Sequence, residues 1–568
     1  MLLRNVSIKN FRCFQDVKVS LDQTTVLIGE NNSGKTSFLD AIRLCLSRAG
    51  TRRGGGLEDY DYHLPTAHAQ PEQVDKLAIV LDFELTQDES DDLVQALGDV
   101  VVFDGSNTRH VILRLSSGFD SALNEFNSDW DFMDVEGNPL VGKNKRLQIL
   151  NTFIQLTPVF YLSALRDAAK EFQGRSAFWA PFLRNPGIPD EVSDRLQLEI
   201  DDLNKEVLKA HAPLQAVKAH LSKIQKIVSI GSGGKVDIEA LPTRIMDMLN
   251  RAQINISAST GASLPLTCHG SGTQSLAVLF LFEAFFATML TKQYDELSRP
   301  IFALEEPEAH LHPCAVRSLW NSLDAISGQK IIATHSGDLL SRVPLAAIRR
   351  FCRRNGKNQI YSVKAGVLTS DEEKKVDFHI QNCRGELLFA RCWLLSDGES
   401  EYWVFSETAS ILGYNLDQLG VRIVNTRYSG VEVLVKVANE LGIGWFFVGD
   451  GDLQGQRDKE ACLKHLQGRN ETKHICVLPV PNIEVLLCEF GFGHIFERHI
   501  SHKKKDKVTA TQGSADYWVQ VVAAQPSKEK PTRIREVMTE MRAGGDGAVP
   551  PILKAVIKAA INIAEVQV

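Results

Sequence analysis

Apolar runs of strand length alternate with helical patterns along much of the chain, which predicts an α/β fold. Residues 25–28 form a short apolar run, followed by a glycine-containing loop and by a helical pattern over residues 38–42. Two further runs, residues 301–304 and 330–333, have the length and apolar character of buried strands. We therefore expect buried strands that are connected through helices.

Two other segments have patterns that indicate their structure. Residues 2–8 alternate loosely between apolar and polar side chains, and residues 17–21 alternate again, as the two arms of a β-hairpin would. The most apolar run, residues 276–290, carries Glu283 and is too short to cross a bilayer. We expect this run to form a buried helix.

The pattern changes at about residue 388. Apolar strands are expected at residues 389–395, 421–424 and 445–448, with an amphipathic helix up to Ile411 and another at residues 431–441. Strands that alternate with helices predict a small parallel sheet. Because ligands gather at the carboxyl ends of parallel strands, any site in this part of the chain is expected at that edge.

A heptad pattern precedes the most apolar helix. Spacings of four and three residues connect Leu196, Ile200, Leu203, Val207, Ala210, Leu214, Val217, Leu221, Ile224 and Val228. Pro213 is expected to divide this seam into two helices. A helical subdomain that packs on its own chain and a dimerisation element explain the pattern equally well.

Composition excludes several classes of protein. The chain has 568 residues, of which 44% are hydrophobic and 23% charged, and its formal net charge is −7, so any nucleic acid would have to bind to local basic patches. The 10 cysteines include no CxxC pair, which argues against a disulfide scaffold and a structural zinc site. No signal peptide is apparent at the N-terminus, and we expect a cytoplasmic protein without a membrane partner.

The loop after the first apolar run has the pattern GxxxxGK(S/T) in a strand–loop–helix context. Gly29 and Gly34 allow successive backbone N–H groups to point at phosphate oxygens, Lys35 reaches the β- and γ-phosphates, and the Thr36 hydroxyl binds Mg²⁺. The pattern therefore predicts an ATP site. Its expected residues are Gly29, Asn31, Asn32, Ser33, Gly34, Lys35, Thr36 and Ser37.

Two other strand ends supply the partners that such a loop needs. Glu305 lies where a carboxylate would hold Mg²⁺, and Glu306 lies where a general base would orient the attacking water. His335 follows the run at 330–333 and could contact the γ-phosphate or that water. Ser271 and Gly272 belong to a run of small residues at a helix N-terminus, where anions bind.

Carboxylates also gather at the strand ends of the C-terminal third. Asp397 and Glu401 follow the first expected strand, and Asp450 and Asp452 follow the third. Carboxylates that converge repel one another unless a cation lies among them, and oxygen ligands suit Mg²⁺ or Mn²⁺. Two such ions could stabilise the attacking and leaving oxygens of a phosphodiester. An acidic loop that binds a nucleotide or calcium without chemistry is the alternative.

The first part of the chain resembles the ATPase head of the ABC/SMC superfamily. The segments IKNFRCF, GENNSGKTS, GSGTQS, FALEEPEAHLHP and IIATHS occur there in this order. The resemblance implies that Ser271 and Gly272 complete the ATP site of a second head, so that the protein is a homodimer or a higher oligomer. Glu305 stands where many members have Asp.

The last third resembles a Toprim domain, whose marks are an acidic-Gly-x-Ser/Thr-Glu turn and a later DxD. Residues 397–401, DGESE, match the turn with Asp in place of the usual Glu, and Asp450-Gly451-Asp452 matches the second. An ABC-type head followed by Toprim resembles the OLD (overcoming lysogenization defect) family of ATP-dependent endonucleases, which includes Gabija-like and retron-associated defence nucleases. The resemblance further implies a metal ligand at Glu484 and an active-site lysine at Lys530 or Lys528.

These expectations combine into one architecture. The N-terminal half of an ABC head covers residues 1–165, a helical insertion 166–255, the C-terminal half of the head 256–380, and Toprim with a C-terminal helical extension 388–568. The expected function is ATP-regulated, metal-dependent cleavage of DNA, and bacterial anti-phage defence with a further partner is implied by resemblance alone. The alternative is a RecF/SMC-like repair ATPase whose Toprim domain is not catalytic.

Basic clusters give the expected DNA a place to bind. Arg349-Arg350, residues 353–357 and residues 502–507 flank the expected nuclease domain and could contact phosphates without reading sequence. Solvated surface charge explains these clusters equally well.

Overall fold

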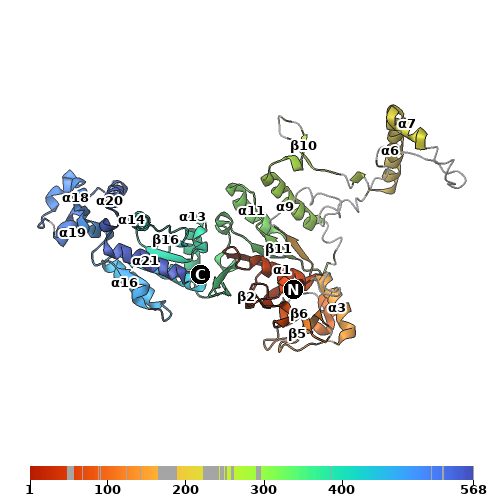
Figure 1. The fold of residues 1–568 in the computed structure, drawn as a ribbon, viewed down its shortest axis with the longest axis horizontal. Coiled ribbons are helices and arrows are strands. Elements are labelled where there is room, and N and C mark those ends of the chain that lie inside the picture. The colour runs from red at the N-terminus through yellow and green to blue at the C-terminus, as the bar shows by residue number, and fades with distance from the viewer. Residues whose placement is uncertain are drawn as a thin grey trace. The chain divides into compact units, whose positions relative to one another are not determined.

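The structure is a computed structural model of the whole chain. It describes residues 1–47, 57–66, 68–86, 89, 91–122, 124–140, 142–163, 188–221, 242, 248–249, 252–257, 261, 263–288, 294, 296–383, 385–512, 514–526 and 530–566. The chain folds into two compact units (Figure 1). The first unit comprises Met1–Leu162, Leu297–Glu308 and Pro313–Val568, and the second comprises Ser163–Glu296 and Ala309–His312. The domain boundaries expected from the sequence stay predictions.

An antiparallel sheet begins the first unit. Its strands follow the order β2-β1-β4-β6-β5, and β7 pairs with β6. β1 and β2 are antiparallel neighbours, with Phe11 opposite Phe14, so the expected N-terminal hairpin is confirmed. The strands are β1 (Leu2–Phe11), β2 (Phe14–Ser20), β4 (Leu77–Leu85), β5 (Val102–Phe103), β6 (Arg109–Asp120) and β7 (Glu125–Met133).

The second sheet of this unit carries the phosphate loop. Its order is β14-β13-β3-β12-β11-β8, and every neighbouring pair is parallel except β13 with β14. The runs at 301–304 and 330–333 are confirmed as buried strands. Because the strands are parallel, the loop after β3 and the residues after β11 and β12 reach the same edge. The strands are β3 (Thr24–Gly29), β8 (Val159–Leu162), β11 (Ile301–Glu305), β12 (Gln329–Ala333), β13 (Ile348–Arg354) and β14 (Lys357–Tyr361).

A third sheet, in the last part of the chain, is parallel throughout and follows the order β16-β15-β17-β18. The expected α/β fold, with a small parallel sheet after about residue 388, is confirmed. One boundary was wrong: residues 386–389 form a 3₁₀ turn, and β15 starts only at Cys392. Leu387 and Leu388 on that turn are buried. The sequence there is therefore as apolar as the strand itself and does not mark where the strand begins. The strands are β15 (Cys392–Ser396), β16 (Val421–Asn425), β17 (Gly444–Gly449) and β18 (Ile475–Val477).

Helices cover these sheets. In the first unit they are α1 (Lys35–Leu46), α2 (Asp91–Leu97), α3 (Lys143–Leu156), α11 (Pro313–Ala325), α12 (Gly337–Leu340), α13 (Ser370–Asn382), α14 (Glu399–Ile411), α15 (Val431–Glu440), α16 (Leu453–Lys464), α17 (Ile483–Leu487), α18 (Gly493–Arg498), α19 (Ala515–Ala523), α20 (Lys530–Gly544) and α21 (Pro551–Glu565). Among the described residues no single helix has the length and hydropathy of a membrane span, although the bent pair Lys530–Ala548 and Pro551–Glu565 passes that test together.

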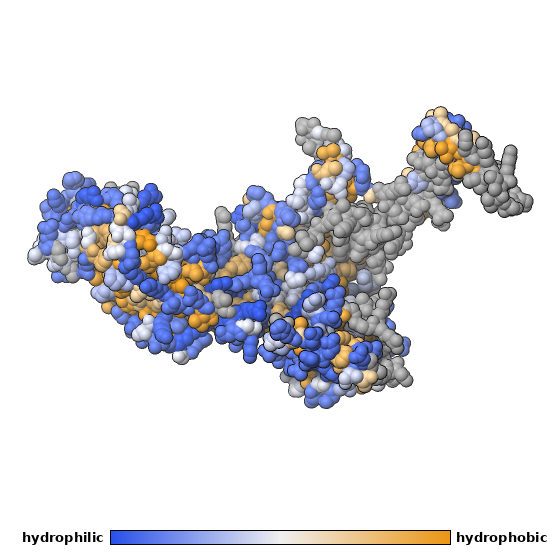
Figure 2. Space-filling model, in the orientation of Figure 1, coloured by the Kyte–Doolittle hydropathy of each residue, from blue (hydrophilic) through white to orange (hydrophobic). Residues whose placement is uncertain are grey.

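The second unit contains the heptad segment and the most apolar helix. Helix α6 ends at Ala210 and α7 begins at Ala212, which confirms that the seam breaks next to Pro213. Leu203, Val217 and Leu221 expose 51%, 47% and 38% of their surface, and apolar side chains gather over these helices in Figure 2. Ile224 and Val228 lie outside the described residues. The elements are α6 (Asp190–Ala210), α7 (Ala212–Leu221), β9 (Asn255–Ser257), β10 (Ser263–Pro265) and α9 (Ser271–Thr288).

One buried side chain joins the second and third sheets. Arg350 on β13 donates hydrogen bonds to the carbonyls of Leu388 (3.2 Å), Ala390 (2.8 Å), Leu441 (3.1 Å) and Gly442 (3.2 Å). Those carbonyls border the starts of β15 and β17.

The structure corrects the hypothesis that Arg349 and Arg350 contact DNA. Each exposes only 5% of its surface. Arg349 binds the carbonyl of Ser20 and the carboxylate of Asp22, both at 2.7 Å. Neither guanidinium is therefore open to a phosphate, and both serve the packing of the strand.

Replacing Arg350 by Met is expected to lower the free energy of unfolding by about 3 kcal/mol, because several buried carbonyls lose charged donors. The midpoint of urea unfolding measures this loss. Arg353→Met is the matched control on the same strand, where the side chain is exposed, and it should change stability by less than about 0.5 kcal/mol. Equal stability of the two variants would show that Arg350 does not hold the sheets together.

Candidate functional site

The phosphate loop is shaped by the residues packed behind it. Gly29 ends β3 with φ 149°, and a side chain there would lie 2.2 Å from the Phe351 carbonyl oxygen. Gly34 has φ 99°, and a side chain there would lie 2.7 Å from the ring of Phe14. The Asn358 amide donates to the carbonyl of Ser33 at 2.8 Å. Both glycines are therefore required by close packing as well as by backbone conformation.

Lys35 lies in the first turn of α1 and points back into the loop. Its ammonium donates to the carbonyls of Gly29 (2.9 Å) and Glu30 (3.0 Å). Burial lowers the pKa of Lys35 to about 8, although Glu306 and Glu305 favour its charged form. The loop carbonyls thus hold a cation that a phosphate group would bind more strongly.

The two expected Mg²⁺ ligands of this site are neighbours. The Thr36 hydroxyl donates to one oxygen of Glu305, and the Tyr161 hydroxyl donates to the other at 2.7 Å. Burial and this carboxylate raise the pKa of Tyr161. The sequence did not predict Tyr161 as a site residue. Its position on β8, which pairs with β11, is the feature that could have indicated it.

The remaining expected residues line one cavity of about 350 Å³. Its walls are Asn31, Asn32, Ser33, Gly34, Lys35, Thr36, Ser37, Glu305, Glu306, Ala333 and His335. His335 Nε2 lies 4.0 Å from a carboxylate oxygen of Glu306. Burial, and then the charge of Lys35, lower the pKa of His335, so its imidazole is neutral at pH 7. The arrangement can hold a nucleotide phosphate beside a carboxylate and a neutral imidazole.

Glu308 supports these strand ends and was also missed. Its carboxylate accepts a hydrogen bond from the Thr334 hydroxyl, which in turn accepts from the backbone N–H of Ser336 at 3.0 Å. Burial raises the pKa of Glu308, and its second oxygen is buried without a hydrogen-bond partner. The only signal was the third acidic residue in the run EEPE.

Ser271 and Gly272 lie in the second unit, in the first turn of α9. The helix therefore starts five residues before the apolar run at 276–290, and the small residues are helical. A side chain on Gly272 would lie 2.8 Å from the His310 carbonyl oxygen, so the glycine permits close packing. Their role in an ATP site stays a prediction.

The second candidate site lies at the carboxyl ends of β15 and β17. Asp397 follows β15, Glu401 lies in the first turn of α14, and Asp450 and Asp452 follow β17. A side chain at Gly398 would collide with the Glu401 carboxylate, whose nearest oxygen would be 1.9 Å away. The glycine therefore leaves room for the Glu401 carboxylate.

Electrostatics show that these carboxylates are neighbours. Burial raises the pKa of Asp450 to about 7, and the charges of Glu401, Glu484, Asp452 and Asp397 add to the effect. Burial also raises the pKa of Glu401, followed by the charge of Glu484. The five residues expected from the sequence thus form one acidic cluster.

Glu484 connects the cluster to Lys530. The Lys530 ammonium lies 2.6 Å from a carboxylate oxygen of Glu484, and the Ser400 hydroxyl donates to the same oxygen at 3.0 Å. Asn482 caps α17 by accepting from the N–H of Val485, which fixes the start of the helix that carries Glu484. Lys528, the other expected lysine, lies outside the described residues.

The donor set fits a divalent cation, although it is not arranged as a finished coordination sphere. One oxygen of Glu401 is buried without a hydrogen-bond partner, and Asp450 is surrounded by like charges. Carboxylate oxygens are the ligands that Mg²⁺ and Mn²⁺ prefer. Over the described part of the chain no three His, Cys, Asp or Glu residues are placed to hold an ion together.

Asp458 is a further acidic residue at this site that sequence reasoning missed. It lies on α16, and burial raises its pKa, with contributions from the charges of Asp397 and Asp452. The Gln454 amide donates to it at 3.0 Å. Its place on the helix that follows Asp452 was the available signal.

Two family models match the chain. One, described as "Protein of unknown function (DUF2813)", matches residues 1–386. The other, described as "Overcoming lysogenization defect protein-like, TOPRIM domain", matches residues 388–452. The expected Toprim domain is therefore confirmed.

Curated proteins resemble most of the chain. It is 28% identical to "Uncharacterized protein YbjD" of Escherichia coli over 524 residues, 88% of each protein. It is 23% identical to "Endonuclease GajA" of Bacillus cereus over 471 residues, 81% of this chain and 76% of that protein. It is 24% identical to "OLD nuclease" of Thermus scotoductus over 481 residues, 80% of this chain and 82% of that protein. The expected similarity to OLD nucleases is confirmed.

Replacing Asp450 by Asn should raise the thermal midpoint of the metal-free chain by about 2–4 °C, because it removes one of the mutually repelling charges. Thermal unfolding in EDTA measures the change. Adding Mg²⁺ should stabilise the wild type and have little effect on the variant. Asp417→Asn, at an exposed residue, is the control. A lower midpoint for Asp450→Asn in EDTA would contradict the repulsion.

Proposed function

Because the chain belongs to the DUF2813 family and carries an OLD-like Toprim domain, we propose that it is an ATP-regulated, metal-dependent DNA endonuclease. The observation that carries this proposal is the acidic cluster of Asp397, Glu401, Asp450, Asp452 and Glu484 beside the ammonium of Lys530. Glu401 and Glu484 of this cluster are buried, and like charges held together in this way destabilise the fold unless cations neutralise them. Similarity to proteins named endonuclease and OLD nuclease supports the same function.

Each part of the cluster has a proposed role in cleavage. Divalent cations, Mg²⁺ or Mn²⁺, would polarise the phosphodiester and lower the pKa of the attacking water. Asp397, Glu401, Asp450, Asp452 and Glu484 would hold them. Lys530 would stabilise negative charge on the phosphate that is cut, because its ammonium already lies among the carboxylates.

We propose that the phosphate loop binds and hydrolyses ATP. Gly29, Lys35 and their loop would hold the phosphates, while Thr36 and Glu305 would hold Mg²⁺. Glu306 would orient the attacking water, and neutral His335 would contact the γ-phosphate or that water. Ser271 and Gly272 would complete the site of a second copy, which makes the protein a homodimer or a higher oligomer.

Surface features support the proposed partners. Residues 502–507 form an exposed basic turn with Lys503, Lys505 and Lys507, which could contact DNA phosphates. The exposed apolar side chains of α6 and α7 would pack against a second copy. A role in anti-phage defence is proposed from the likeness to the proteins named above.

The structure also suggests how ATP would influence cleavage. Glu30 of the phosphate loop forms a two-pronged ion pair with Arg391, whose Nη2 lies 3.1 Å from its carboxylate. Arg391 directly precedes β15, and Asp397 follows the far end of that strand. Lys35 holds the carbonyl of the same Glu30. A bound phosphate that attracts Lys35 away from the Glu30 carbonyl would therefore change the loop conformation at Glu30, the residue that is ion-paired with Arg391 of the Toprim domain.

Plasmid cleavage tests the function directly. The wild-type chain is expected to cut supercoiled DNA with Mg²⁺ or Mn²⁺, and Asp450→Ala should lower the rate at least about 100-fold while ATP hydrolysis continues. Lys35→Ala should abolish ATP hydrolysis. Asp417→Ala, at an exposed residue of the same domain, should cut like the wild type. Unchanged cleavage by Asp450→Ala would refute the site, and no cleavage by the wild type under any metal condition would refute the function.

The ion pair between Glu30 and Arg391 predicts a separate effect. Arg391→Ala should keep metal-dependent cleavage and ATP hydrolysis but lose most of the change in cleavage rate that ATP causes. The reversed pair, Glu30→Arg with Arg391→Glu, should restore part of it. Arg422→Ala removes exposed ion pairs with Glu386 and Asp417 and is the control. If ATP changed the cleavage rate of Arg391→Ala as much as that of the wild type, the proposal that this ion pair transmits the effect of ATP would be contradicted.

A further inference from the structure

A cavity of about 380 Å³ lies beside the acidic cluster, at the carboxyl ends of β15 and β16. Two of its lining residues, Ser396 and Gly398, flank Asp397 of the cluster in the sequence. On the other side, the lining residue Tyr428 follows Arg427, whose Nε lies 3.6 Å from a carboxylate oxygen of Asp397. The cavity and the cluster are therefore neighbours, and a ligand held at one extends naturally into the other.

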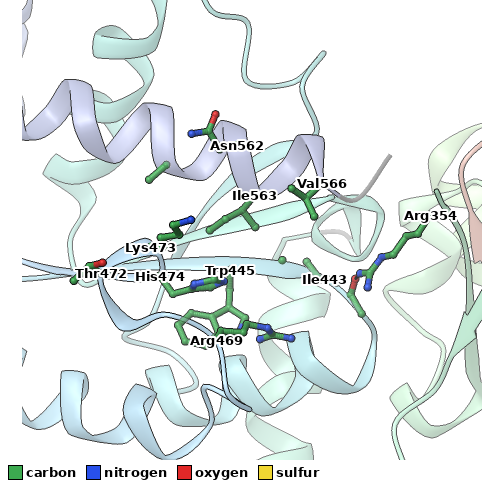
Figure 3. Close-up of a pocket in the computed structure, with 13 residues that line it drawn as sticks. Arg354, Ile443, Trp445, Arg469, Thr472, Lys473, His474, Asn562, Ile563 and Val566 are labelled. Atoms are coloured by element: carbon green, nitrogen blue, oxygen red, sulfur yellow. Dashed lines mark hydrogen bonds between the residues drawn. The ribbon is translucent and has the colours of Figure 1, made fainter.

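A larger cavity, of about 580 Å³, lies at the opposite edge of the same sheet (Figure 3). Its residues Ile443 and Trp445 lie at the start of β17, whereas Asp450 follows the carboxyl end of that strand. A ligand in the larger cavity would therefore be separated from the acidic cluster by the length of the strand. The smaller cavity borders the cluster directly.

Three exposed aromatic side chains line the smaller cavity. Tyr402, Trp403 and Tyr428 expose 50%, 58% and 55% of their surface. The rings of Tyr402 and Trp403 are edge-on to each other, with centroids 5.6 Å apart. Exposed apolar area that gathers in this way marks a binding surface. Aromatic faces are the platforms on which proteins stack the bases of unpaired nucleic-acid strands.

The charges that line this cavity cancel. Glu386 and Arg422 form an ion pair with 3.3 Å between nitrogen and oxygen, so neither presents a free charge to a ligand. Burial lowers the pKa of His379, so its ring is uncharged at neutral pH, and its Nδ1 lies 3.0 Å from the Ser429 hydroxyl. A neutral aromatic wall suits an uncharged, flat group rather than a phosphate.

Polar side chains on the wall complement the edge of such a group. Ser396 is buried, and its hydroxyl has no hydrogen-bond partner among the described residues. The side-chain oxygen of Asn425 accepts from the backbone N–H of Arg427 at 2.9 Å, which leaves its NH₂ group as a donor. Because nucleobases carry donors and acceptors on their edges, they fit this wall better than a purely apolar side chain does.

We propose that this cavity binds an unpaired nucleobase of the DNA strand whose phosphate lies at the acidic cluster. The base would stack on the rings of Tyr402 and Trp403 and present its polar edge to Asn425. This inference rests on the proposed cleavage of DNA and names its substrate class, which is DNA with unpaired nucleotides at the point of cleavage. A fully paired duplex would first have to unstack a base.

The fluorescence of a short single strand in which 2-aminopurine alternates with thymine tests the site, because stacking on an aromatic ring quenches 2-aminopurine. The full chain carries Asp450→Ala and is studied with Mg²⁺, so that the probe is not cut. Quenching is expected, and adding Trp403→Ala should remove most of it and weaken binding about tenfold. Phe490→Ala, at an exposed aromatic residue outside the cavity, is the matched control and should leave both unchanged.

A second pair of variants tests the cavity without removing a ring from it. Cys383→Trp fills the cavity from an exposed position at the end of α13 and should also weaken binding about tenfold. Val566→Trp fills the larger cavity from an exposed position at the end of α21 and should leave binding unchanged. The same strand paired with its complement should bind more weakly than the single strand, because its bases are already stacked on one another.

The proposal is overturned if the probe is not quenched, if both cavity variants bind like their controls, or if the paired strand binds as tightly as the single strand. Loss of self-association by Trp403→Ala with unchanged quenching would assign the aromatic wall to a second copy of the chain and would also overturn it. The proposed cleavage is tested separately by the wild type on plasmid. If quenching and its loss occur but the wild type does not cut, the base site stands and only the cleavage function fails.

Discussion

The buried guanidinium of Arg350 is the contact on which the architecture depends. It comes from β13, which pairs with the strand that leads into the phosphate loop, with Arg350 opposite Ile28. Its hydrogen bonds end on carbonyls at the starts of β15 and β17, the two strands that lead to the acidic cluster. Because charged hydrogen bonds to buried carbonyls are strong and directional, the two sheets share a fixed backbone junction. A change at one sheet can therefore reach the other without a flexible linker.

Each candidate site holds a lysine ammonium at the place where a charged ligand would bind. The expected ligand is an anion in one site and a cation in the other. In the phosphate loop, Lys35 lies on the backbone carbonyls of its own loop, in the place where an anion would take over. In the acidic cluster, Lys530 lies on Glu484, in the place where metal cations would take over. Each site is partly neutralised by the chain itself. Ligand binding would then be an exchange of partners, which costs less than creating an unpaired buried charge.

The sequence could predict those residues that follow a strand end in a motif. Glu305, Asp397 and Asp450 were found because parallel strands carry such residues to one edge. Tyr161 and Asp458 were missed because they reach the sites from the middle of a strand pair and from a helix, where no local pattern marks them. The hypothesis that Arg350 contacts DNA was wrong, because a pair of arginines gives the same sequence pattern on a surface and at a buried junction. Only the structure gives the exposure that separates the two.

The electrostatic cost of the acidic cluster is also an argument about function. A Toprim domain that serves only as a scaffold would be more stable with amides than with carboxylates at Asp450 and Glu401, since burial raises the pKa of both. This chain has the carboxylates, and one oxygen of Glu401 has no hydrogen-bond partner at all. A buried acceptor without a donor is costly unless a ligand supplies one. The proposed metal-dependent chemistry would account for that cost, whereas the RecF-like scaffold leaves it without a reason.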